Sequence, residues 1–145
     1  MELVRREFVV DVPAEEAWNR LSLVERWPSW AKHIKSVSLT PPGSLTASSA
    51  GRFHLAGGAR STFRMERFEP PVRWQWVGRF LTVSVQYDHR FEAIDERQTR
   101  LTWIVTAHGP GTATLGRLFG GLYARNLDRA IPRLQSELRS AREGS

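Results

Sequence analysis

Tyr87 and His89 could share or move a proton, and they lie two positions apart in the most regular alternating segment of the chain. An imidazole and a phenol so placed could act as acid and base, or could orient a carbonyl or enol group of a ligand. Residues two apart on a strand share one face, so both would point into a cavity if that face is internal. A structural interpretation stays open, because Asp88-His89-Arg90 could instead mark the solvated end of the strand.

Aromatic side chains are the second candidate feature, since six tryptophans are many for 145 residues. Flat rings suit a polycyclic or quinone-like ligand through stacking and burial of area. The same rings could equally fill the core of a small domain, and Phe53, Phe63 and Met65 of the middle strands carry the same two interpretations. The tryptophans concerned are Trp27, Trp30, Trp74, Trp76 and Trp103.

Several kinds of chemistry lack the residues they need. The chain has no cysteine, which excludes disulfides, thiolate zinc sites and cysteine nucleophiles. Its histidines, at positions 33, 54, 89 and 108, do not have the spacing of metal ligands. Neither a Gly-x-Ser-x-Gly elbow nor a phosphate-binding loop is present. We therefore expect no metal and no cofactor.

The chain is basic, with 21 Lys and Arg against 15 Asp and Glu and a net charge of +6. Arg125, Arg129 and Arg133 lie on the side of the last helix opposite its apolar arc. A specific nucleic-acid reader would also need a groove-binding helix or an exposed aromatic platform, and neither is expected. We interpret these arginines as a solvated face, or as a peripheral contact with an anionic membrane or an acidic partner. The charged N-terminus and the lack of a long apolar run predict a cytoplasmic protein.

Short strands must position these residues. The alternation of Phe8, Val10 and Val12 predicts a first strand, followed by one helical segment from Pro13 and another short one over 23–34. Alternating patterns then predict strands up to residue 107, separated by turn residues. Gly78-Arg79 predicts a tight connection, and residues 81–91 predict the longest strand, with Leu81, Tyr87 and His89 on one face.

A long amphipathic helix closes the chain, and we expect its regular part to begin near Gly120 and to bend near Pro132. Such a helix can cover one face of an antiparallel sheet of six to seven strands. The physical solution is a curved sheet wrapped around the helix, with a cavity between them. Composition alone singles out the loop over 42–51 and the glycine-rich start of the last helix as candidate gates.

The order of these elements resembles a known superfamily, the START-like or helix-grip proteins. The segment Phe8-Val9-Val10-Asp11-Val12-Pro13-Ala14-Glu15-Glu16-Ala17-Trp18 is similar to the first strand and helix of the polyketide cyclase/dehydrase and lipid-transport (SRPBCC) proteins. Trp27-Pro28-Ser29-Trp30, Glu69-Pro70-Pro71 before Trp74-Gln75-Trp76, and the end of the chain from Leu101 resemble later parts of the same family. The resemblance implies an α+β helix-grip fold and a single domain over residues 1–145.

The family is functionally broad, so the fold alone does not give the function. The resemblance implies a hydrophobic small-molecule ligand that is polyketide-like, a lipid or a quinone. If the protein is an enzyme, it implies cyclisation or dehydration without a metal or cofactor, with Tyr87 and His89 as catalytic residues. The alternatives are a non-enzymatic lipid or quinone carrier, and a protein-interaction module like the heat-shock-protein activators. The expected ligand-binding residues are Trp30, Phe53, Phe63, Met65, Trp76, Tyr87, His89, Trp103, Tyr123, Asn126 and Leu127.

Overall fold

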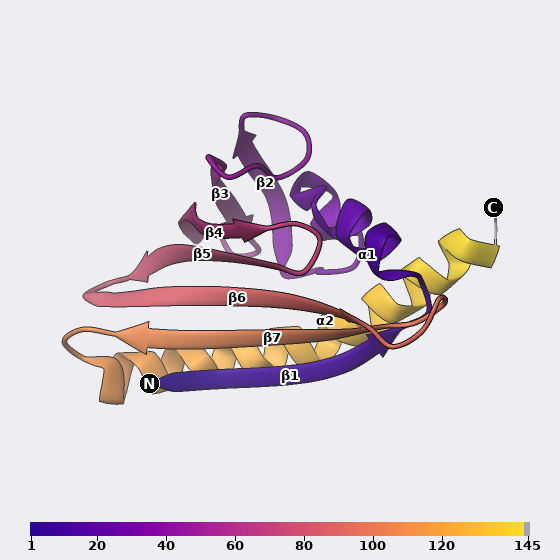
Figure 1. The fold of residues 1–145 in the computed structure, drawn as a ribbon. Helices are drawn as coiled ribbons and strands as arrows, with labels where there is room; N and C mark the ends of the chain where they lie inside the picture. The colour runs from indigo at the N-terminus through magenta and orange to yellow at the C-terminus, as the bar shows by residue number, and fades with distance from the viewer. Residues whose placement is uncertain (144–145) are drawn as a thin grey trace.

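The protein is a seven-stranded antiparallel sheet with a long C-terminal helix, as the computed structural model shows (Figure 1). The structure describes residues 1–143, so positions 144 and 145 of the predicted domain lie outside the described residues. The elements are β1 (Glu2–Val10), α1 (Ala14–Leu21), the 3-10 helix η1 (Val24–Ser29), β2 (Ile34–Thr40), β3 (Ala50–Leu55), β4 (Arg60–Glu69), β5 (Arg73–Phe80), β6 (Val83–Ala93), β7 (Thr99–His108), the π-helical turn η2 (Thr112–Gly116) and α2 (Arg117–Glu143).

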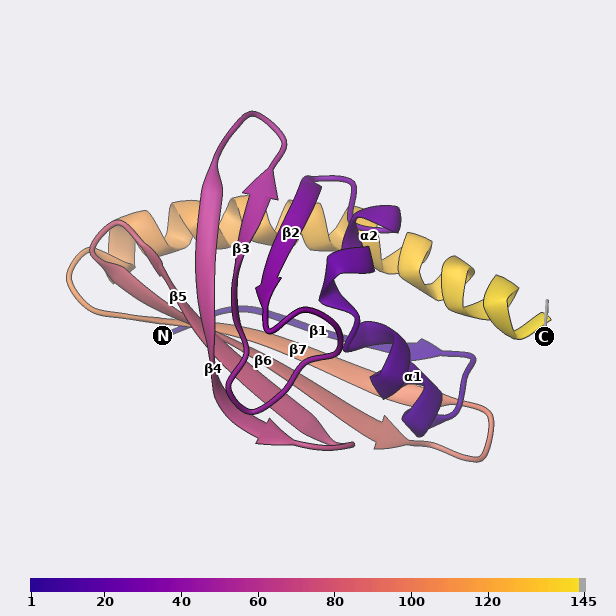
Figure 2. The ribbon, with the colours of Figure 1, turned by 90° about the horizontal axis from the view of Figure 1, so that it is seen from above.

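The strands follow the order β1-β7-β6-β5-β4-β3-β2, so the two strands that flank the short helices in sequence form the two edges. In Figures 1 and 2 the half formed by β2, β3 and β4 curves away from β6 and β7 and crosses over α2. Irregular register in β1, β2 and β4 accompanies this curvature. The predicted helix-grip fold, including both short helices after the first strand, is confirmed.

Two glycines allow the central strands to approach each other closely. Gly51 of β3 and Gly78 of β5 both pair with Phe63 of β4, one from each side. A Cβ at Gly51 would lie 2.6 Å from the Phe63 ring, and one at Gly78 would lie 2.5 Å from the backbone oxygen of Thr62. Glycine at such positions lets a sheet bend, because it has no side chain to clash with the neighbouring strand. The Phe63 ring covers the space that Gly51 leaves.

The predicted connection at Gly78-Arg79 is wrong. Gly78 lies inside β5, and the turn falls at Leu81 and Thr82. Glycine is a common turn residue, but at position 78 it leaves room for the neighbouring strand. Leu81 consequently does not share the buried face of β6: it is 66% exposed and has a positive φ of 55°.

The two faces of the sheet differ in polarity. Alternate residues of β6 and β7, including Val85, Leu101 and Val105, are buried against the helices. On the outer face, Asp88 accepts two hydrogen bonds from Arg73, at 2.8 and 2.9 Å, and one from Arg90 at 2.9 Å. Charged residues thus form ion pairs on the outer face of the sheet, and the apolar inner face is available for a core and a cavity.

Hydrogen bonds connect the last helix to β1 and to the residue that follows it. Arg6 donates to Asp128 at 2.6 Å, Arg139 donates to Asp11 at 3.0 Å, and Gln135 donates to the backbone oxygen of Val9 at 2.9 Å. The helix begins at Arg117 rather than near Gly120, because the π-helical turn η2 leads directly into it.

Pro132 lies inside the helix, and both ribbon views show the axis of α2 changing direction in its C-terminal part (Figures 1 and 2). Proline lacks the backbone N–H that would bond to the preceding turn, which accounts for such a bend. Among the helices that the structure describes, none is long and apolar enough to cross a membrane.

Candidate functional site

A cavity of about 330 Å³ lies between the curved sheet and α2. Its inner end is formed by buried side chains of η1 and the central strands, among them Trp27, His89 and Trp103. Its outer lining includes the exposed residues Arg60, Arg79 and Leu122, so the mouth lies between the β3–β4 turn, the end of β5 and the first turns of α2. The predicted gate at the start of the last helix agrees with this position, whereas no residue of the loop 42–51 lines the cavity.

The structure brings together ten of the eleven residues that we expected to contact a ligand. They come from the residue that follows η1, from five strands and from α2, and they are Trp30, Phe53, Phe63, Trp76, Tyr87, His89, Trp103, Tyr123, Asn126 and Leu127.

Met65 is the exception. It is buried on the same face of β4 as Phe63, but it does not line the cavity. The chain before β3 runs beside β4 here, where Ser49 accepts the Met65 backbone N–H at 2.8 Å and Leu45 is buried. Met65 therefore packs in the core.

The tryptophans divide into two groups. Trp27, Trp30, Trp76 and Trp103 line the cavity, and Trp27 is stacked on Trp103 with ring centroids 6.2 Å apart. Trp74 is fully buried outside the lining, where its ring and that of Trp18 meet edge to face at 5.0 Å. The expectation that Trp74 could face a ligand is not supported, because α1 covers it through Trp18. Some tryptophans therefore fill the core and others surround the cavity.

His89 lies among aromatic rings at the inner end of the cavity. It pairs with Trp74 on β5 and Trp103 on β7, and its imidazole stacks on the Trp74 ring at 5.0 Å. Burial lowers the pKa of His89 to about 4, and the opposing effect of the Asp88 carboxylate is smaller. Within the described residues, His89 Nδ1 and Trp103 Nε1 have no hydrogen-bond partner. The imidazole is consequently neutral at physiological pH, and the strand does not end in solvent at this position.

The phenol groups lie nearer the mouth. The rings of Tyr87 and Tyr123 have centroids 5.6 Å apart, so β6 and α2 meet across the cavity here. Burial raises the pKa of Tyr87, Tyr123 raises it further, and a hydrogen bond with Ser61 acts in the opposite direction. Burial also raises the pKa of Tyr123. Both phenols therefore stay protonated and can donate hydrogen bonds, and Asn126 offers an amide in the same lining.

Sequence reasoning missed several lining residues. Phe119 and Ala130 belong to the apolar arc of the last helix, so helical periodicity alone could have identified them. Arg60 and Arg79 gave no such signal, because their place at the mouth depends on how two turns meet in space. His33 also lines the cavity, and burial lowers its pKa.

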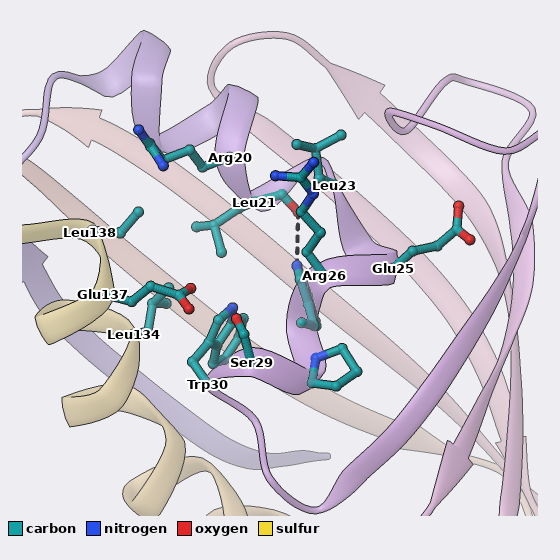
Figure 3. Close-up of a pocket in the computed structure, with 12 residues that line it drawn as sticks. Arg20, Leu21, Leu23, Glu25, Arg26, Ser29, Trp30, Leu134, Glu137 and Leu138 are labelled. Carbon is teal, nitrogen blue, oxygen red and sulfur yellow. Dashed lines mark hydrogen bonds between the residues drawn. The ribbon is translucent and has the colours of Figure 1, made fainter. Parts of the chain in front are cut away.

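A second hollow, of about 530 Å³, lies on the other side of Trp27 and Trp30, between η1, the end of α1 and the C-terminal part of α2. Figure 3 shows its mixed lining, with Leu134 and Leu138 beside the charged Glu137, and the hydrogen bond of 2.9 Å from Trp27 Nε1 to the Leu21 backbone oxygen. Its charged groups are exposed to solvent, so it is a surface recess. The narrower aromatic cavity has the character of a small-molecule site.

Among the described residues, no group of three His, Asp or Glu side chains could hold a metal ion.

Comparison with known proteins gives one family match. The family model for polyketide cyclase / dehydrase and lipid transport matches residues 1–135. No curated protein matches the chain.

Solved structures resemble the chain in fold at low sequence identity. BexL, a di-domain ARO/CYC from the BE-7585A biosynthetic pathway, has a TM-score of 0.74 and 15% identity, over 96% of this chain and 46% of that one. The Zhui aromatase/cyclase from a Streptomyces species has a TM-score of 0.68 and 16% identity, over 94% and 92% of the two chains. A protein from Thermobifida fusca has a TM-score of 0.74 and 15% identity, over 93% and 91%.

Proposed function

Because the chain belongs to the polyketide cyclase / dehydrase and lipid transport family, we propose that it binds a flat, uncharged hydrophobic molecule in the cavity between the sheet and α2. The family resemblance noted in the sequence motifs is confirmed by the family match. The observation that carries the proposal is the convergence of four indole rings on one cavity of about 330 Å³. Aromatic walls of this kind favour ring systems through stacking and burial of area.

The inner end of the cavity excludes charge. The charged residues of the lining, Arg60 and Arg79, lie at the mouth. His89 is neutral at physiological pH because burial lowers its pKa to about 4. An ion placed beside these rings would lose its hydration without gaining an opposite charge. A ligand therefore enters with its uncharged ring system first.

Tyr87 is proposed as the group that orients the ligand. Its protonated hydroxyl can donate to a carbonyl or quinone oxygen, with Ser61 as its neighbour. A protein-interaction module needs no cavity, so an interior fully packed with side chains would have favoured that alternative. The aromatic cavity instead supports a ligand-binding protein, either a carrier or an enzyme.

The first test compares two probes of the same shape, 2-acetylnaphthalene and 2-ethylnaphthalene, by isothermal titration calorimetry. We expect the ketone to bind about 5- to 10-fold more tightly, because Tyr87 donates to its oxygen. Tyr87→Phe should remove this preference and leave binding of the hydrocarbon unchanged. Phe119→Leu serves as the control, since it alters the lining without removing a donor. Equal binding of both probes to the wild type contradicts the orienting role, and no binding of either contradicts the proposed function.

A second candidate function is dehydration of a β-hydroxy ketone, which the shared location of Tyr87 and His89 favours. The neutral imidazole of His89 would take a proton from the carbon next to the carbonyl, Tyr87 would donate a proton to the departing hydroxyl, and water would leave as the double bond forms. The stacked walls would hold the substrate in a reactive arrangement.

The probe 3-hydroxy-1-tetralone tests this chemistry, because loss of water and tautomerisation give fluorescent 1-naphthol. We expect dehydration to fall at least 100-fold in His89→Phe, and the wild-type rate to be level above about pH 5, since the basic form of His89 dominates above its pKa of about 4. Turnover that survives in His89→Phe excludes His89 as the base. Binding without turnover in the wild type assigns the protein to the carriers.

A further inference from the structure

The mouth of the cavity is surrounded by exposed apolar side chains. Leu81 is 66% exposed, Leu118 is 60% exposed and Leu122 is 53% exposed. We refer to these three as the mouth leucines. Leu122 belongs to the cavity lining, and Leu118 lies one turn earlier on the same side of α2.

The β5–β6 turn brings Leu81 to the same end of the molecule. Phe80, its neighbour in the chain, contacts Phe119 of α2 with ring centroids 5.1 Å apart, and Thr82 donates to the Pro110 backbone oxygen at 2.7 Å. In Figure 1 this turn and the start of α2 lie at one end of the sheet.

The backbone at Leu81 makes its exposure more informative. Its φ of 55° is left-handed, a conformation that glycine or asparagine adopts at much lower cost than leucine. The two-residue turn between β5 and β6 requires a positive φ at its first residue, and leucine occupies that position although glycine would adopt it at lower cost. Because its side chain is exposed, packing within the fold does not explain why leucine stands at this position.

The chain segments that form the mouth contain basic residues but no acidic ones. Residues 50–65, 70–87 and 97–127, which supply the two turns and the start of α2, contain no Asp or Glu. They do contain Arg60 and Arg79 in the cavity lining, and Arg117 and Arg125 exposed on α2 beside the mouth leucines. A surface with protruding leucines among arginines is complementary to an anionic lipid bilayer, which offers both an apolar layer and negative headgroups.

We propose that the cavity mouth docks on anionic lipid membranes, with the mouth leucines inserted among the lipids and Arg60, Arg79, Arg117 and Arg125 against the headgroups. This orientation would open the cavity toward the bilayer, so that a hydrophobic ligand could pass between the two without crossing water. Of the three arginines that the sequence pattern indicated for such a contact, only Arg125 belongs to this surface. Arg129 and Arg133 lie further along α2, away from the mouth.

Co-sedimentation with phosphatidylglycerol and phosphatidylcholine vesicles tests the proposal. We expect binding to the anionic vesicles, and a fall of at least tenfold in the partition coefficient for Leu81→Ser/Leu118→Ser and for Arg117→Gln/Arg125→Gln. Val72→Ser/Ile94→Ser is the matched control, because these residues are also exposed, at 53% and 41%, but lie in the turns at the opposite ends of the strands.

Three outcomes overturn the proposal: no binding to the anionic vesicles, equal loss in the control pair, or equal binding to both kinds of vesicle. Immobilised polyglutamate serves as a model of an acidic protein. If it retains the wild type and the Leu81→Ser/Leu118→Ser variant equally, and neither binds vesicles, the surface would be assigned to an acidic protein. Calorimetry with 2-acetylnaphthalene on the same variants keeps this test separate from that of the proposed ligand site, because none of the substituted residues lines the cavity.

Discussion

Ala130→Phe is expected to abolish ligand binding while leaving the protein folded. Ala130 is 1% exposed, and its side chain faces the cavity from the middle of α2. A phenyl ring added there would occupy the space beside Leu127 in which a naphthalene ring must lie. We expect the affinity for 2-acetylnaphthalene to fall at least 100-fold by isothermal titration calorimetry, because the phenyl ring would take the part of the cavity in which the rings of the probe must lie.

Thermal unfolding provides the second readout of this variant. A ring that fills apolar space leaves the free energy of unfolding equal or higher, unless it forces its neighbours out of their rotamers. The probe at 100 times its dissociation constant should stabilise the wild type by about 2.7 kcal/mol and should not stabilise Ala130→Phe. Ser136→Phe adds the same ring to the exposed side of α2 and should bind normally. Wild-type affinity in Ala130→Phe would show that the ligand lies elsewhere.

The sequence predicts which residues face the cavity wherever the regular period of a single strand or helix decides the direction of its side chains. Alternation along β6 placed Tyr87 and His89 on the buried face, and helical periodicity placed Tyr123 and Leu127 together on α2. These patterns depend only on backbone geometry, which the local sequence largely determines.

Residues whose position depends on how separate elements meet could not be predicted in this way. Phe63 and Met65 have the same pattern on the same strand, yet only Phe63 lines the cavity, whereas Met65 is packed in the core. Gly78 has the local signature of a turn, but the close approach of Thr62 explains it. The division of the tryptophans likewise follows from the place of α1, which covers Trp74 and leaves Trp76 free to line the cavity.

Acid is expected to destabilise the protein through His89. The pKa of this imidazole is about 4 in the folded protein, against 6.5 in an exposed chain. Between these two values the unfolded chain binds a proton that the folded protein does not, so the free energy of unfolding falls as the pH falls from 6.5 to 4. The loss amounts to about 2 kcal/mol at pH 5 and about 3 kcal/mol at pH 4. His33, whose pKa is also lowered by burial, adds to it with the same sign.

His89→Phe should remove most of this pH dependence. The phenyl ring keeps the stacking on Trp74 and takes away the titrating group. Urea unfolding at pH 7 and pH 5 measures the effect, and the loss on acidification should be about 2 kcal/mol smaller in His89→Phe than in the wild type. His108→Phe is the matched control, because His108 is exposed and the buried imidazole stays in place. If His89→Phe and the wild type lose the same stability on acidification, His89 is not held neutral by burial, and the uncharged inner end of the proposed ligand site loses its physical basis.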